Sequence, residues 1–251
     1  MKTIFQVIAL LFYSFFTYFF WIERTHERAA IIICVLGVLC FFHAQFRLGL
    51  NLAVIVAITH FLSWICSQST YLQWPLDFYI MAAAGFLYLK FFDRKNSISL
   101  GWKVPFTKSQ ILSILIINIP SVAVLLWYFM ENKEVAKQWP IPELPIWAMP
   151  ILVFLMAAVN GLREEVYFRG LLQSQTNKDF SPWFTILFQA ILFGGLHFSG
   201  AFPQGWIGVF LTALWGGAIA IQFQIFRSIK LAWLTHSIAD AIMFTTILVA
   251  R

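Results

Sequence analysis

Charged side chains are scarce in this sequence. Asp, Glu, Lys and Arg make up only 11% of the residues, whereas 61% are hydrophobic. A soluble domain carries about 25% charged and roughly 45–50% apolar residues, so this chain has too few polar side chains to cover a water-facing surface. The composition excludes a soluble globular enzyme and a disordered protein. It indicates a polytopic α-helical membrane protein, because the apolar stretches are continuous runs and not the ten-residue alternations of a β-barrel.

Cysteines are few, and the common hydrolase motifs are absent. Cys34, Cys40 and Cys66 lie in apolar stretches without a Cys-x-x-Cys motif, so we interpret them as buried packing residues. The sequence has no His-Glu-x-x-His motif and no Gly-x-Ser-x-Gly motif. It therefore gives no support to a zincin-type metalloprotease or to a serine nucleophile on an elbow turn.

Apolar runs fill most of the chain instead. A helix needs about 20 apolar residues to cross the hydrocarbon core of a bilayer. The predicted fold is an all-α polytopic membrane protein with about eight (8–9) transmembrane helices, in a single transmembrane domain over residues 1–251. The candidate spans are 3–22, 29–46, 48–66, 76–92, 111–130, 147–170, 182–198, 205–226 and 231–249. We interpret the first as a retained span, because it is longer than the h-region of about 7–15 residues in a signal peptide.

The net charge of +6 is spread in small groups between these runs. More lysines and arginines fall on the cytoplasmic side if the N-terminus is cytoplasmic, and the positive-inside rule favours that orientation. The basic residues therefore set topology, and we expect no nucleic-acid partner. The compact size and short loops are typical of a protein of a prokaryotic cell (inner) membrane.

Ionisable residues inside the spans gather in the C-terminal half. Each costs roughly 2.5–3.5 kcal/mol on insertion scales, so they need partners there. The N-terminal half carries His43 and His60, which we expect to be dispensable. The C-terminal half carries Arg163, Glu164, Glu165 and Arg169 in the sixth span, His197 near the end of the seventh, and His236 and Asp240 in the ninth.

The two adjacent glutamates have different surroundings on a helix. Arg169 follows Glu165 by four residues and shares its face, so these two are predicted to form an ion pair. Glu164 points about 100° away and has no obvious local partner. An unpaired carboxylate in a cleft of low dielectric suits a general base or acid. The alternative is that all these charges lie at a helix end among the lipid headgroups.

The remaining polar residues permit three kinds of chemistry. His236 and Asp240 are an i, i+4 pair on one helical face, and His197 follows two glycines. In a hydrolase, Glu164 and His197 would activate a water while His236 and Asp240 stabilise an oxyanion. His and carboxylate ligands would also suit zinc, and buried Glu, His and Arg can form the relay of an ion-coupled transporter. Because His197 ends one span and His236 begins another, we expect a pocket below the membrane surface or an incomplete span.

Three motifs taken together resemble those of the CAAX protease and bacteriocin-processing (CPBP, or Abi) family, which includes the CAAX prenyl endopeptidases. They are Glu164-Glu165-x-x-x-Arg169, Phe193-x-x-x-His197 and His236-x-x-x-Asp240. The sequence after the glutamates and the sequence before His236 are also similar to the family. The resemblance covers residues 147–249 as a catalytic core, whereas residues 1–146 are spans without motifs.

The resemblance implies an intramembrane glutamic protease without a cofactor, although the family was long described as metalloproteases and a zinc site remains the alternative. Glu164 would be the general base for water, assisted by His197, with Glu165 and Arg169 as structural support. His236 and Asp240 would lie at the oxyanion site. The prenyl endopeptidases carry Asn where this chain has Asp240. An ionised Asp cannot donate a hydrogen bond, so Asp240 is either protonated or orients His236, which then donates.

The expected function is an endopeptidase that hydrolyses a peptide bond near the terminus of a membrane-associated or prenylated protein or peptide precursor. Its expected partners are that substrate and membrane lipid. The alternative within the same family is a non-catalytic membrane scaffold or regulator.

Overall fold

The computed structural model describes residues 75–92, 100–103, 105–137, 145–198 and 202–249, with scattered positions between 55 and 72. The first two candidate spans, most of the third, and Cys34, Cys40, His43 and His60 lie outside the described residues. Cys66 is described and is buried, as predicted.

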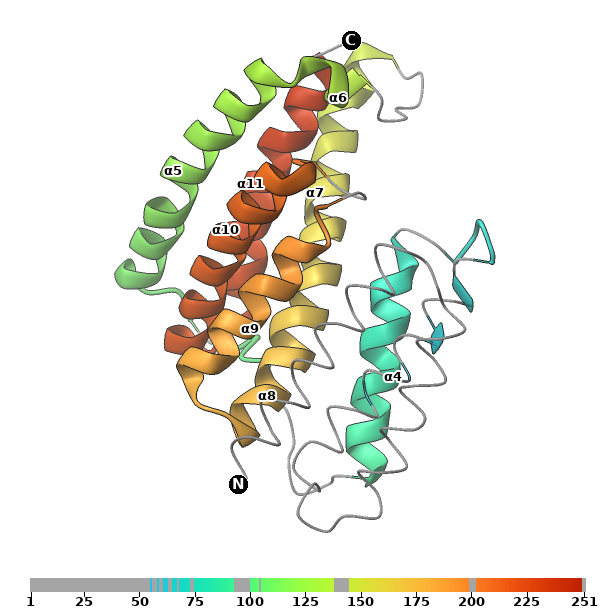
Figure 1. The fold of residues 1–251 in the computed structure, drawn as a ribbon, viewed down its shortest axis with the longest axis vertical. Helices are drawn as coiled ribbons and strands as arrows, with labels where there is room; N and C mark the ends of the chain where they lie inside the picture. The colour runs from blue at the N-terminus through green and yellow to red at the C-terminus, as the bar shows by residue number, and fades with distance from the viewer. Residues whose placement is uncertain are drawn as a thin grey trace.

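The described part of the chain is all-helical and contains no strand. Its elements are α4 (Leu76–Phe92), α5 (Lys108–Glu131), α6 (Lys133–Lys137), η2 (Ile146–Ala148), α7 (Met149–Glu165), η3 (Val166–Gln173), α8 (Ser174–Asp179), α9 (Pro182–Gly195), α10 (Gly205–Phe226) and α11 (Ile229–Val249). Figure 1 shows α5, α7, α10 and α11 as long helices of one bundle, with α4 at the side of α7.

Four helical stretches among the described residues are long and apolar enough to cross a membrane. They are Lys108–Glu131, Ile146–Lys178, Gly205–Phe226 and Ile229–Val249. The predicted spans 76–92 and 205–226 coincide with α4 and α10. The total of eight or nine spans stays a prediction, because the first spans lie outside the described residues.

The helix that carries the two glutamates continues past its predicted end. Pro150 occupies its first turn, where the missing N–H breaks no helical hydrogen bond. The chain then remains helical through η3, which is a π-helix, and into α8. The 33-residue stretch Ile146–Lys178 is therefore one helical segment, whereas the sequence pattern ended the span at residue 170.

Polar side chains join η3 and α8 to α10 along their length. Arg169 Nη2 donates to the Gly216 carbonyl at 2.7 Å, Gln173 Nε2 to the Ala220 carbonyl at 2.9 Å, and Asn177 Nδ2 to Gln224 Oε1 at 2.8 Å. Each donor lies 47 residues before its acceptor, so the two helices run parallel here in a fixed register. Interhelical hydrogen bonds of this kind hold helices together where lipid removes the hydrophobic drive.

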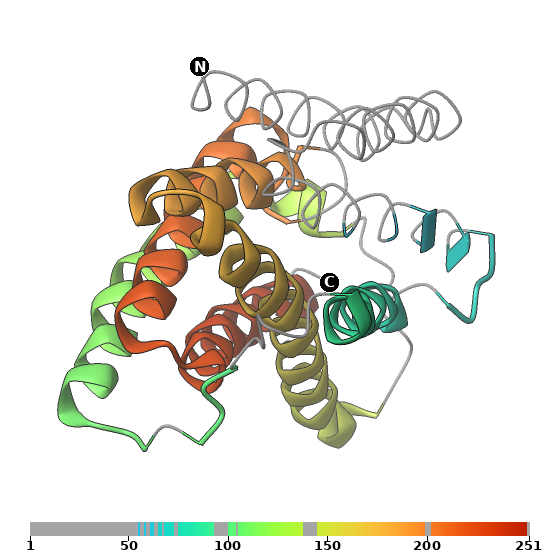
Figure 2. The same cartoon turned by 90° about the horizontal axis from the view of Figure 1, so that it is seen from below.

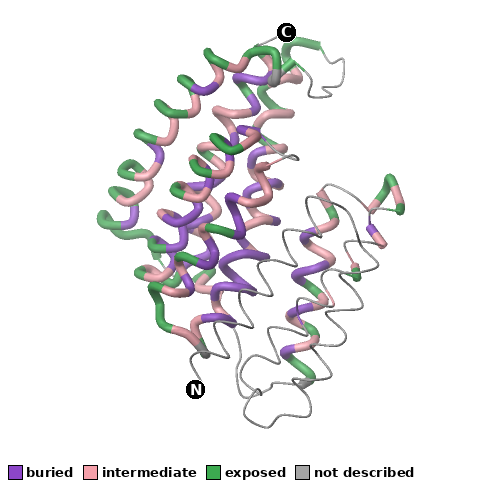
Figure 3. The backbone as a smooth tube through the Cα atoms, in the orientation of Figure 1, coloured by how far each residue is buried: buried purple, intermediate pink, exposed green. Residues whose placement is uncertain are grey.

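Burial is concentrated on the helices around the two glutamates. Figure 3 shows buried positions along α7, η3, α9, α10 and α11, while α5 is exposed over much of its length. The exposed side chains of α5 include Ile116, Ile119, Trp127 and Met130. An apolar outer surface fits contact with lipid and not with water.

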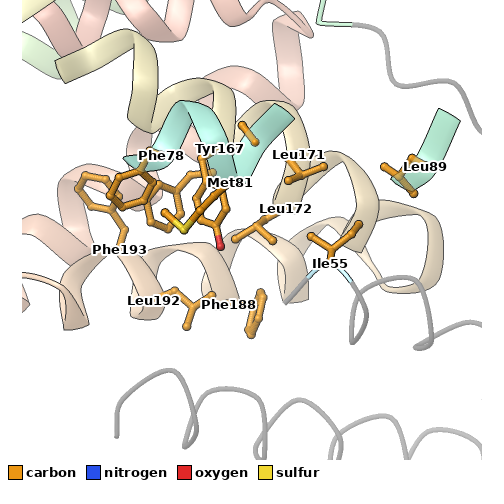
Figure 4. Packing of buried hydrophobic residues seen from close by; sticks show 12 residues of the cluster. Ile55, Phe78, Met81, Leu89, Tyr167, Leu171, Leu172, Phe188, Leu192 and Phe193 are labelled. Atoms are coloured by element: carbon orange, nitrogen blue, oxygen red, sulfur yellow. The ribbon is translucent and has the colours of Figure 1, made fainter. Parts of the chain in front are cut away.

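A cluster of buried side chains packs α4 and α9 against η3. It contains Phe78 and Met81 from α4, Leu171 from η3, and Leu192 and Phe193 from α9, among others, and Figure 4 shows these side chains meeting. From below, in Figure 2, α4 lies beside the helix that runs from α7 into η3. This packing places the N-terminal end of α4 next to the polar residues of α7.

The basic stretch before α5 rests on the start of α11. Ile229 N donates to the Leu100 carbonyl at 2.9 Å, and the Trp102 ring stacks on Trp233 at 5.8 Å. Gly101 has a φ of +61°, and a Cβ there would lie 1.7 Å from the Arg227 carbonyl oxygen. The described part of the segment between α4 and α5 is thus held against the turn between α10 and α11.

Candidate active site

The charged residues of the sixth predicted span lie well inside a helix. Glu164 and Glu165 are near the middle of the segment Ile146–Lys178, so they do not lie at its end, as the headgroup alternative requires. His236 lies about two turns into α11. The site is therefore built within the helical bundle.

The short helix α9 accounts for the depth of His197. It has 14 residues and spans about 21 Å, whereas the hydrocarbon core is about 30 Å thick. It ends at Gly195, and the chain then turns at His197. Figure 1 shows α9 rising along the bundle to less than the full length of its neighbours. The short helix α9 fits one of the two expectations from the sequence, an incomplete span.

Glu165 is the most enclosed carboxylate of the site. It is fully buried, and its Oε1 accepts from Arg169 Nη1 at 3.0 Å. The predicted ion pair is thus present. The same oxygen lies 2.7 Å from His236 Nδ1. A carboxylate paired with an arginine only accepts hydrogen bonds, so Nδ1 carries the proton and the free ring nitrogen of His236 is Nε2.

Glu164 has a local partner that the helical spacing did not indicate. Its Oε1 accepts from Nη2 of the adjacent Arg163 at 3.1 Å. Its Oε2 lies 3.6 Å from His236 Nε2. The Glu164 side chain is 14% exposed, whereas that of Glu165 is 0% exposed. Of the two glutamates, Glu164 is therefore the one that a water or substrate can reach.

Asp240 contacts two other polar residues of the site. Its Oδ2 accepts from Asn160 Nδ2 at 3.0 Å and lies 3.6 Å from His236 Nε2. This oxygen accepts a hydrogen bond, which both sequence-based alternatives for Asp240 permit. Both Glu164 and Asp240 therefore point an oxygen at the same ring nitrogen.

His197 is linked to the same centre through aromatic packing. Its Nδ1 lies 3.1 Å from the Phe193 carbonyl, an acceptor, so Nδ1 donates and Nε2 holds the lone pair. The Phe193 ring lies 5.3 Å from the His197 ring and 5.9 Å from the His236 ring. Glu164 and His236 both interact with His197 electrostatically. The described residues include no hydrogen bond between His197 and Glu164.

Four residues of this site were not assigned a role by sequence reasoning. Arg163 and Asn160 hold Glu164 and Asp240, Asp77 of α4 pairs with Arg163, and the Trp215 ring packs on His236 at 4.6 Å. Asp77 is a carboxylate within a predicted span, and Asn160 lies one helical turn before the glutamates. Both polar residues are visible in the sequence, but Asp77 lies 86 residues from its partner Arg163, and Asn160 lies 80 residues from its partner Asp240.

The zinc alternative requires three or more His, Cys, Asp or Glu side chains directed at one point. Among the described residues, no such group is arranged to hold a metal ion. One oxygen each of Glu164, Glu165 and Asp240 accepts a hydrogen bond from Arg163, Arg169 and Asn160, respectively.

The arrangement suits activation of a water beside a hydrogen-bond donor. Glu164 Oε2 and Asp240 Oδ2 each lie 3.6 Å from His236 Nε2, which is longer than a direct hydrogen bond. A water that lies beside these atoms, and not between them, can hydrogen-bond to more than one of them. A carboxylate on one side and an imidazole on the other can then share the proton transfers of a hydrolysis.

Comparison with known proteins gives one match over the residues of this site. No curated protein and no solved structure matches the chain. One family model, Type II CAAX prenyl endopeptidase Rce1-like, matches residues 145–242. This range starts just before α7, ends in α11, and includes every charged residue of the site except Asp77. Residues 145–242 of this chain are therefore similar to the Rce1-like type II CAAX prenyl endopeptidases, which is consistent with a domain of the CAAX protease family.

Proposed function

We propose that this protein is an intramembrane endopeptidase that uses Glu164 to activate water. The observation that carries the proposal is the meeting of Glu164 Oε2 and Asp240 Oδ2 at His236 Nε2, each at 3.6 Å. The residues come from two helices of the domain that matches the protease family. The proposed substrate is a protein or peptide precursor whose terminus lies in or at the membrane, with or without a prenyl group.

The proposed reaction is hydrolysis of one peptide bond. The Glu164 carboxylate takes a proton from water as the water oxygen bonds to the carbonyl carbon, with His197 assisting from the end of α9. The carbonyl oxygen becomes an oxyanion, which His236 stabilises by donating from Nε2 in its protonated form. The carbon–nitrogen bond then breaks, and the proton passes from Glu164 to the leaving nitrogen.

The other groups keep the reacting atoms in place. Glu165 accepts from His236 Nδ1 and so presents Nε2 to the substrate. Asp240 lies beside Nε2, where a negative charge favours the protonated imidazole. Because Asp240 accepts the Asn160 hydrogen bond, it orients His236, and His236 supplies the hydrogen bond that an asparagine would otherwise give.

The test compares protein termini in membranes and secreted fractions from cells that carry the wild type or Glu164→Gln. This change removes the base but little volume, so the variant should fold and a terminus should be present only with the wild type. Glu134→Gln is the matched control, because Glu134 is an exposed carboxylate paired with Lys137 on α6. It should leave the termini unchanged.

Two results would overturn the proposal. Identical termini for wild type and Glu164→Gln, together with full function of the variant in a deletion strain, would point to a non-catalytic scaffold or regulator. A wild-type-specific terminus that persists in Glu164→Gln would remove Glu164 from the role of base. Hydrolysis in water labelled with oxygen-18 should place the label in the new carboxyl group.

A further inference from the structure

Arg163 lies at the centre of the contacts that join the site to α4. Its Nε donates to Asn160 Oδ1 at 2.9 Å, its Nη1 to Asp77 Oδ1 at 2.8 Å, and its Nη2 to Glu164 Oε1 at 3.1 Å. The side chain is only 10% exposed, so these acceptors replace the water that a free guanidinium would bind. A buried cation requires such partners.

We propose that Arg163 is a positioning residue for the reaction and that Asp77, from the N-terminal half, anchors it. This inference rests on the proposed function and extends it beyond the residues that match the family. Arg163 acts through Glu164 on one side and through Asn160 and Asp240 on the other. Asp77 holds the guanidinium in the position that permits its contacts with both Glu164 and Asn160.

The contact with Asn160 fixes the direction of a hydrogen-bond chain. Arginine has no acceptor atom, so the Asn160 atom that faces Nε must be the amide oxygen. The amide nitrogen of Asn160 then faces Asp240 and donates to its Oδ2 at 3.0 Å. Arg163 therefore determines which atom of Asn160 meets Asp240, and with it the position of the carboxylate beside His236.

The contact with Glu164 sets the direction of the proposed base. Arg163 occupies Oε1, which leaves Oε2 facing His236 Nε2. Guanidinium groups readily bind both oxygens of one carboxylate. The Asp77 contact at Nη1 prevents this two-pronged pairing. Without Asp77, Arg163 would be free to bind both oxygens of Glu164, and its N–H would compete with the proton of the water for the lone pair of Oε2.

Asp77 is itself held in position by the start of α4. Its Oδ1 accepts from the Phe78 backbone N–H at 2.8 Å, and the Phe78 ring lies 4.6 Å from the Arg163 guanidinium carbon. Tyr79 donates to the Val159 carbonyl at 3.1 Å, which fastens the same end of α4 to α7. The N-terminal half therefore supplies an anchored charge to the site.

The test is a double-variant cycle in the full chain, with Asp77→Asn, Arg163→Gln and both changes together. The substrate is a peptide carrying the cleavage site whose terminus depends on Glu164. Each single change should lower kcat about 10- to 100-fold, as loss of outer supporting contacts does in other sites, with KM little changed. The double variant should be no slower than the slower single variant. Asp77→Glu should restore part of the rate, whereas Arg163→Lys should not, because an ammonium lacks the planar fork.

The matched control is the exposed pair Glu134 and Lys137 on α6. Glu134→Gln, Lys137→Gln and their combination remove the same charges outside the site and should leave kcat unchanged. Thermal stability of every variant is measured in the same detergent, because a loss of folded protein would lower the amount of active enzyme without changing KM.

The results separate this inference from the proposed function. If the wild type cleaves and Asp77→Asn cleaves equally well, the inference is wrong and the proposed function stands. Independent, multiplying losses of kcat, or losses fully explained by a smaller folded fraction, would also overturn it. If no terminus depends on Glu164, the proposed function fails and the positioning role fails with it.

Discussion

Glu165 Oε1 lies 2.7 Å from His236 Nδ1, across the interface of α7 and α11. The same oxygen binds Arg169 at 3.0 Å. One buried carboxylate thus orients the imidazole and neutralises the guanidinium. The sequence indicated only the second of these contacts, because Arg169 is four residues away whereas His236 is 71 residues away.

The first prediction is that Glu165→Gln reduces folded yield as well as cleavage. The amide cannot neutralise Arg169, which is fully buried. Breaking a buried ion pair by removing one partner costs about 3–5 kcal/mol. Membrane expression and thermal stability in detergent measure the loss, with Glu164→Gln as the well-folded comparison. A folded but inactive Glu165→Gln, with an active Glu164→Gln, would mean that the two glutamates have exchanged roles.

The second prediction concerns the other half of that pair. Arg169→Met should also reduce folded yield, because it leaves Glu165 unpaired and removes the hydrogen bond to the Gly216 carbonyl. Adding Glu165→Leu should recover part of the yield, since replacing both ions by apolar side chains is often neutral or stabilising. The double variant should still fail to cleave, because His236 loses its orienting carboxylate. A double variant less stable than either single variant would contradict the assignment.

The helices were largely predictable because lipid imposes a simple length rule. The predicted spans 76–92 and 205–226 match α4 and α10, and 231–249 begins two residues inside α11. The sixth predicted span ends at residue 170, whereas the helical stretch that contains it continues to Lys178. Arg169 and Gln173 in this stretch bind α10.

The candidate site was predictable only in part, because spacing along the sequence indicates only local contacts. Local spacing indicates i, i+4 neighbours such as Glu165 and Arg169. It does not indicate contacts between distant segments, such as Asp77 with Arg163 or Asn160 with Asp240. The i, i+4 spacing also left Glu164 without an obvious partner, although the adjacent Arg163 donates to it. The motif residues from three helices do lie around one aromatic ring, Phe193.

The third prediction uses two adjacent glycines at the end of α9. A Cβ on Gly194 would lie 2.5 Å from the Val209 carbonyl oxygen, whereas a Cβ on Gly195 would meet nothing within 4 Å. Gly194→Ala must push α9 away from α10, and overpacking of this kind costs about 1–3 kcal/mol. Gly195→Ala is the matched control and should retain stability and cleavage. Equal thermal stability of the two variants would show that the helices do not approach this closely.

The fourth prediction concerns metal dependence. If Glu164 is the base, cleavage by the purified enzyme should continue after treatment with a chelator such as EDTA. Cleavage rates before chelation, after chelation and after addition of zinc measure this directly. Activity that is lost to the chelator and returns with zinc would replace the glutamate mechanism by a zinc-bound water.

The fifth prediction separates packing from positioning within one helix. The Phe193 ring contacts the rings of His197 and His236, and the Arg169 guanidinium lies 5.0 Å from its centre. Phe188 is buried in the same cluster, and its ring stacks on Phe184. Phe193→Leu and Phe188→Leu should each cost less than about 1.5 kcal/mol, because both exchange one apolar side chain for another of similar volume. Only Phe193→Leu should lower kcat, since it alone frees both histidine rings to turn. Thermal stability and kcat are measured on both variants. Equal kcat values would mean that the Phe193 ring serves packing alone.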